Sequence, residues 1–134
     1  MKKRLLLIVM IFLQVSITAM SQKVLRYNAD KKQVNITTID GTLTIIPLTD
    51  NAVRTIFSKQ VYRVMPELVY VENLKNPTFN VKENNDKVSI CLKNMTIAVD
   101  RNTGLVVYLD KNGKQILAEN GRSLDHSFVG KEKT

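Results

Sequence analysis

Three runs between residues 33 and 58 alternate hydrophobic and polar side chains with a period of two. Because successive side chains of a β-strand point to opposite faces of a sheet, this pattern predicts strands with one buried face. Asp40-Gly41 and Asp50-Asn51 separate the runs, and both pairs are typical of tight turns. We therefore predict an antiparallel meander of three short strands, the second of which ends at Pro47.

The same alternation returns in the second half of the chain. The runs with strand character are residues 79–82, 88–92, 95–99 and 105–109, followed by one more strand after Gly113. Turn sequences recur at intervals of about eight to twelve residues, which is typical of antiparallel sandwiches and barrels. Pro66 and Pro77 exclude a central strand between the two halves. No helical stripe follows the N-terminal segment, so we predict an all-β fold, an antiparallel β-sandwich.

The first 21 residues have the organisation of a secretory signal peptide. Lys2, Lys3 and Arg4 precede nine apolar residues, 5–13, and the small-residue pattern Ala19-Met20-Ser21 follows. A membrane span would need about 20 apolar residues, and Gln14 interrupts this run too early. We predict cleavage after Ser21, which exports the product to the periplasm or the cell exterior without a stable membrane anchor.

Removing those 21 residues from the 134 leaves 113, which suits one domain with one modest core. We assign the domain to residues 22–124. Residues 125–134 are polar and carry no predicted closing strand, so they are either a tail or the point where a longer sheet is cut. Without the three basic residues of the signal, the formal charge falls from +8 to +5. The other basic residues are scattered and form no stripe, so nucleic-acid binding is not expected.

Cys91 is the only cysteine, which excludes an internal disulfide. Alternation places it on the face opposite Val88 and Ile90, so we expect a half-buried structural thiol. His126 is the only histidine and cannot form a zinc site alone. Its neighbours Asp125 and Ser127 point away from it on an extended chain, which excludes a catalytic relay. The residues predict no metal and no cofactor.

Asp100 and Asp110 are the carboxylate pair to consider for glycoside hydrolysis, which uses two such groups. Each stands where a strand enters a turn, and there Asp usually accepts hydrogen bonds from the local backbone. We therefore favour a turn role for both and predict no catalytic residue. The segment 110–113 resembles the start of a calcium loop, but its glycine comes two positions early and a third ligand is missing.

Aromatic rings are the usual platforms of carbohydrate-binding surfaces, and this chain has no Trp. Tyr70 and Tyr108 are the candidates for such a platform. A Tyr on a half-exposed strand is also common for packing reasons alone. Both interpretations stay open at this point.

Two patterns in the chain are similar to those of a known family. Residues 51–54 read N-x-V-R within the segment 42–59 (TLTIIPLTDNAVRTIFSK), and residues 66–70 read PELVY. Val99 to Glu119 form the pattern V-x-x-x-T-G followed by D-x-x-G-x-x-I-L-x-E, within the segment 88–124. These segments resemble the N-terminal β-sandwich domain of glycoside hydrolase family 31, the α-glucosidases and α-xylosidases. The resemblance covers nearly all of residues 23–124, in turns and core positions.

The resemblance implies a galactose mutarotase-like sandwich that precedes a (β/α)₈ barrel, which supplies the catalytic aspartates of this family. This chain ends before any barrel, so the sandwich is expected to be incomplete and inactive alone. Its implied partners are the barrel and, through the parent enzyme, an α-glucoside or α-xyloside. Asp100 and Asp110 match turn positions of the family hairpin. The alternative is a stand-alone exported module that binds carbohydrate or another partner.

Overall fold

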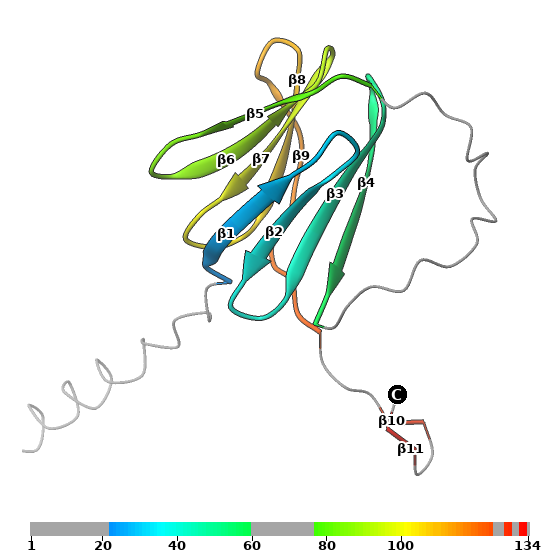
Figure 1. The fold of residues 1–134 in the computed structure, drawn as a ribbon. Coiled ribbons are helices and arrows are strands. Elements are labelled where there is room, and N and C mark those ends of the chain that lie inside the picture. Colours follow the sequence, from blue (N-terminus) through cyan, green and yellow to red (C-terminus); the bar gives the residue numbers. More distant parts are fainter. Residues whose placement is uncertain (1–21, 60–76, 125–127, 130–131, 134) are drawn as a thin grey trace, which may run out of the picture.

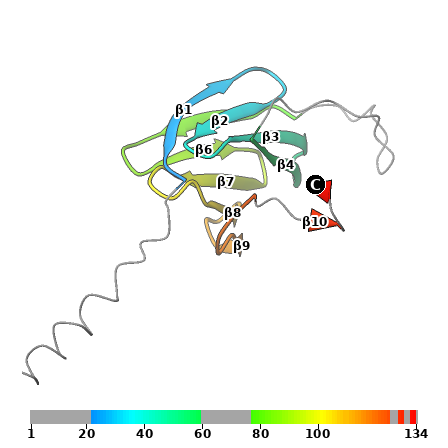
Figure 2. The ribbon, with the colours of Figure 1, turned by 90° about the horizontal axis from the view of Figure 1, so that it is seen from below.

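The computed structural model describes residues 22–59, 77–124, 128–129 and 132–133. All regular elements within these residues are strands, and two antiparallel sheets face each other as a β-sandwich, as predicted (Figure 1). Figure 2 shows the two sheets from below as two layers. The predicted signal peptide, Tyr70 and His126 with its two neighbours lie outside the described residues.

The first sheet is a meander of four strands in the order β1-β2-β3-β4. These strands are β1 (Val24–Ala29), β2 (Val34–Thr38), β3 (Thr42–Thr49) and β4 (Ala52–Ser58). The predicted three-strand meander is confirmed as β2, β3 and β4. β1 was not predicted, because only Val24 of its six residues is buried and the alternation is lost. It is an edge strand whose register shifts between Val24 and Arg26.

The prediction that the second strand ends at Pro47 is wrong. β3 continues to Thr49, and the fully buried Pro47 pairs with Val53 of β4. On the other side of β3, the pairing with β2 reaches only Ile45, which is opposite Val34, the first residue of β2. Pro47 lies beyond that point, so its missing N–H removes no hydrogen bond between β2 and β3.

The second sheet is a meander of five strands in the order β5-β6-β7-β8-β9. They are β5 (Asn80–Glu83), β6 (Lys87–Cys91), β7 (Met95–Asp100), β8 (Val106–Asp110) and β9 (Gln115–Ala118). Each predicted run is within one or two residues of its strand. In the polar tail, β10 (Phe128–Val129) pairs with β11 (Glu132–Lys133), a ribbon that the sequence analysis did not predict. Strands of two residues are too short to carry an alternation pattern.

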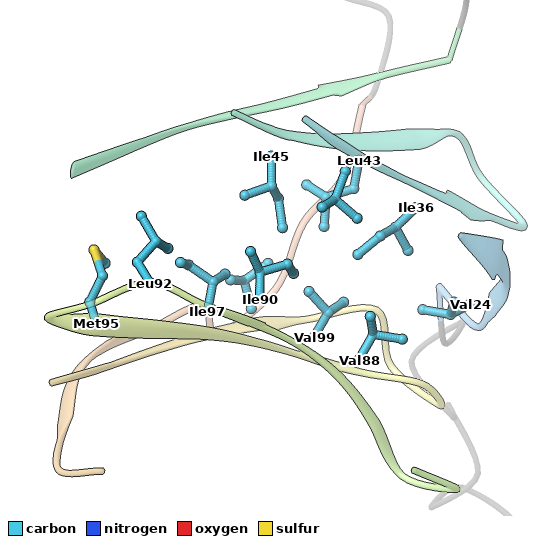
Figure 3. Close-up of a cluster of buried hydrophobic side chains, with 12 residues drawn as sticks. Val24, Ile36, Leu43, Ile45, Val88, Ile90, Leu92, Met95, Ile97 and Val99 are labelled. Atoms are coloured by element: carbon cyan, nitrogen blue, oxygen red, sulfur yellow. The ribbon is translucent and has the colours of Figure 1, made fainter. Parts of the chain in front are cut away.

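The core lies between the sheets and consists of aliphatic side chains from the inner face of each (Figure 3). The first sheet contributes Val24, Val34, Ile36, Leu43 and Ile45, and the second contributes Val88, Ile90, Leu92, Met95, Ile97, Val99 and Val106. The cross-strand register brings these side chains to one face, because Ile90 pairs with Ile97 and Ile97 pairs with Tyr108 across β6, β7 and β8. The sandwich is thus held by its hydrophobic core, without a disulfide.

Candidate functional site

Tyr108 lies on the inner face of β8 and joins the two sheets. Its hydroxyl lies 3.0 Å from Oγ1 of Thr55 in β4, and its ring packs against the core. It pairs with Ile97 on one side and with Leu117 of β9 on the other. These contacts give the ring a structural role between the sheets, and a role in sugar binding stays a prediction.

Asp100 closes the turn that follows β7. Its Oδ1 accepts hydrogen bonds from the N–H of Asn102 at 2.9 Å, the N–H of Thr103 at 2.7 Å and the hydroxyl of Thr103 at 3.0 Å. Burial acts to raise the pKa of this carboxyl, but the three hydrogen bonds outweigh burial and hold the pKa below its ordinary value. A carboxylate held in this way is stabilised as the anion and is a poor proton donor.

Asp110 closes the hairpin between β8 and β9. Its Oδ1 accepts from the N–H of Asn112 at 2.8 Å and from the N–H of Lys114 at 2.9 Å. Gly113 follows with φ of 82°, a conformation that glycine adopts without strain. The hairpin-turn prediction for this segment is confirmed.

The two aspartates do not converge. Asp110 pairs with Met95 at the start of β7, whereas Asp100 is the last residue of the same strand. Five residue steps along a strand separate their positions by roughly 17 Å, well beyond the about 5–9.5 Å between the carboxyl groups of glycosidases. The pair therefore cannot act together on one glycosidic bond.

Cys91 is the other candidate residue that lies in the described part of the chain. Cys91 is half-buried, as predicted, on the outer face of its sheet between Asn80 and Thr96. No group of three or more His, Cys, Asp or Glu side chains that could hold a metal ion occurs in residues 22–59 and 77–124 or the short tail strands.

Among the residues that the structure describes, the largest polar cluster surrounds Arg122, which the sequence analysis did not single out. Residues 119–124 leave β9 and reach the end of β4, where Lys59 Nζ donates to the Leu124 carbonyl at 2.6 Å (Figure 1). The Arg122 side chain is only 10% exposed and forms an ion pair with Glu119. Its guanidinium carbon lies 4.6 Å from the centre of the Phe57 ring, a cation–π distance.

Arg122 also binds the first described residue. Its Nη1 donates to Oε1 of Gln22 at 3.2 Å, its Nη2 donates to the Gly104 carbonyl at 3.1 Å, and its own carbonyl accepts from Gln22 Nε2 at 2.6 Å. The cluster joins Gln22 to residues 119–122, far along the chain. No local sequence pattern signals such a contact, because the two residues are 100 positions apart.

A hollow of about 510 Å³ lies where the end of β1 meets the start of β5. It is lined by Ala29, Asp30, Lys31, Pro77, Thr78 and Phe79. Oδ1 of Asp30 is engaged by the N–H groups of Lys32 and Gln33, at 2.6 and 2.9 Å. The lining combines the apolar residues Ala29, Pro77 and Phe79 with the polar residues Asp30, Lys31 and Thr78. The sequence analysis did not predict this hollow, because its two sides come from segments without a shared pattern.

Comparison of the chain with models of protein families and with curated proteins finds no match. No helix with the length and hydrophobicity needed to cross a bilayer occurs in the described part of the chain.

Proposed function

We propose that this chain is the non-catalytic β-sandwich part of an exported α-glycosidase similar to glycoside hydrolase family 31. In this proposal the catalytic groups come from a barrel outside the chain, and the sandwich supports the substrate pocket. The proposal rests on the sequence resemblance and agrees with the two-sheet architecture.

The observation that carries the non-catalytic assignment is the engagement of Asp100 and Asp110 in turns at opposite ends of β7. Neither carboxylate is placed for general acid catalysis with the other. The uncovered strand β9 supports a packing role, since Ile116 is 64% exposed and Leu117 is 61% exposed. Apolar side chains of this size on an edge strand favour a surface that another part of a larger protein covers.

The test measures hydrolysis of α-glucosides and α-xylosides by the purified chain. We expect no turnover above the buffer blank, and turnover that Asp100→Asn abolishes would overturn the assignment. The DNA directly downstream of the Thr134 codon gives a second test. A barrel-coding segment there, in frame or frameshifted, supports the proposal, and an unrelated gene speaks for a stand-alone module.

The stand-alone carbohydrate-binding module remains the second candidate, and the hollow beside Phe79 favours it. Its test is a calorimetric titration of the chain with maltose and with xylobiose. Binding that Lys31→Ala or Thr78→Val weakens would support this candidate, since both residues line the hollow. Lys111→Ala is the matched control, because Lys111 is an exposed lysine of the β8–β9 hairpin that does not line the hollow.

A further inference from the structure

The side chain of Gln22 is held on both of its polar atoms by a single residue. Nε2 donates to the Arg122 carbonyl at 2.6 Å, and Oε1 accepts from Arg122 Nη1 at 3.2 Å. A carbonyl only accepts and a guanidinium only donates, so this pair of bonds fixes which end of the amide is which. We call these two hydrogen bonds the Gln22–Arg122 clasp.

The clasp is buried and its surroundings are closely packed. Gln22 is only 5% exposed, although glutamine is usually a surface residue. The backbone carbonyl oxygen of Gln22 lies against Gly104, where an added Cβ would come within 2.3 Å of this oxygen. The next residues continue the anchoring, because Val24 N donates to the Arg101 carbonyl at 2.8 Å. Gln22 is therefore fixed through both its backbone and its side chain.

Glutamine at a chain start has a reaction that interior glutamine lacks. The free α-amine attacks the side-chain Cδ, the Cδ–Nε2 bond breaks, and Nε2 leaves as ammonia with the proton that the amine gives up. The product is a five-membered lactam, pyroglutamate, and no oxidant or co-reactant is needed. A part of the α-amine is in the reactive neutral form near neutral pH, since its pKa is about 7.7–8.0.

We propose that Gln22 is the first residue of the mature chain and that the Gln22–Arg122 clasp keeps it from cyclising to pyroglutamate. This inference rests on the proposed export, which removes residues 1–21. The reaction needs Cδ to fold back onto the α-nitrogen, and an amide held by two hydrogen bonds to Arg122 is not free to do so. Cyclisation would also remove the amide that satisfies the Arg122 carbonyl, and an unpaired buried acceptor is costly.

The experiment expresses the full-length gene in a secreting bacterial host and measures the N-terminal peptide of the folded product by mass spectrometry. We expect a chain that begins at Gln22 and whose N-terminal peptide has the mass of uncyclised glutamine. A folded chain that begins with pyroglutamate at position 22 would show that the clasp does not prevent cyclisation, while the proposed export would stand. A chain that begins elsewhere, or that retains residues 1–21, overturns the inference at the cleavage step. None of these results depends on the glycosidase assay.

A second arm tests whether the fold is the protection. The same product is incubated in buffer and in unfolding urea at one pH and temperature, and the cyclised fraction is followed with time. We expect cyclisation at least about tenfold faster in urea, because only opened molecules react. Equal rates in the two samples would contradict the inference.

Variants locate the protection in Arg122. Arg122→Ala removes the donor to Oε1, and we expect cyclisation several-fold faster than in the unaltered chain under native conditions. Arg101→Ala is the matched control, because Arg101 pairs through its side chain with Glu83 and the Asn84 carbonyl. A similar acceleration in both variants would overturn the role of Arg122, and the urea comparison decides the question if Arg122→Ala does not fold.

Discussion

Thr55 of β4 and Tyr108 of β8 meet across the sandwich, with their oxygens 3.0 Å apart. One residue belongs to each sheet, so the contact fixes how the edge of the first sheet lies over the second. The Tyr108 ring packs against the hydrophobic core beside this bond. The residue thus serves both the polar and the apolar part of the interface.

Tyr108→Phe tests the polar part of this contact. The substitution keeps the ring and removes the hydroxyl, so we expect a loss of about 0.5–1.5 kcal/mol in the free energy of unfolding. Urea unfolding followed by circular dichroism measures the loss. Thr55→Val removes the other partner, and the double variant should lose less than the sum of the two single losses. Strict additivity would mean that the two hydroxyls do not bond in solution.

The glycines at two turns form a matched pair for a second prediction. Gly104 and Gly113 have φ of 66° and 82°, so alanine at either position pays for a left-handed backbone, about 1–2 kcal/mol. At Gly104 the new Cβ would also lie 2.3 Å from the Gln22 carbonyl oxygen, whereas at Gly113 it meets nothing within 4 Å. We expect Gly104→Ala to lower the free energy of unfolding by about 1–3 kcal/mol more than Gly113→Ala. Equal losses would argue that Gln22 is not packed against Gly104.

The strands were predictable from the sequence where one face is buried and the other is not. In β3, buried and half-buried residues alternate from Thr42 to Leu48, and the buried Leu43 and Ile45 pair with buried aliphatic residues of β2. The turn roles of Asp100 and Asp110 were predictable for a local reason, because each binds N–H groups only two to four residues away. Alternation and turn chemistry are short-range signals, and a single sequence contains them.

The contacts between distant segments were not predictable. Arg122 meets Gln22 and Phe57 only because residues 119–124 reach the end of β4, and no spacing in the sequence encodes that path. β1 escaped prediction for a related reason, since its exposed Leu25 and partly buried Tyr27 blur the period of two. The hollow beside Phe79 likewise combines segments of both sheets. Long-range packing decides such features, and local pattern does not.

Asp100 makes stability depend on acid pH. Its pKa is lower in the folded chain than the about 3.9 of an unfolded Asp, so the folded state binds fewer protons in this range. Its contribution to stability is therefore present above the unfolded pKa and is lost as the pH falls through the folded pKa. We expect the free energy of unfolding of Asp100→Asn to fall less steeply than that of the unaltered chain below about pH 4.

Thr103→Val is the companion variant for this test. It removes the hydroxyl that donates to Asp100 at 3.0 Å and keeps the backbone N–H of residue 103. The pKa of Asp100, measured by NMR titration, should rise toward its ordinary value, and the acid dependence of stability should weaken. An unchanged pKa in this variant would mean that the Thr103 hydroxyl does not stabilise the carboxylate.

The uncovered strand β9 leads to the last prediction. Leu117 is 61% exposed on the end strand of its sheet, and the four residues of β9 contain neither a charge nor a proline to discourage edge pairing. We expect the chain to associate as its concentration rises, and Leu117→Lys to reduce this association, measured by light scattering. Ile39→Lys is the control, since Ile39 is 58% exposed between β2 and β3 and receives the same charge. If both lysines reduce association equally, the net charge and not the β9 edge is responsible. That result would contradict the proposal that a neighbouring domain covers β9.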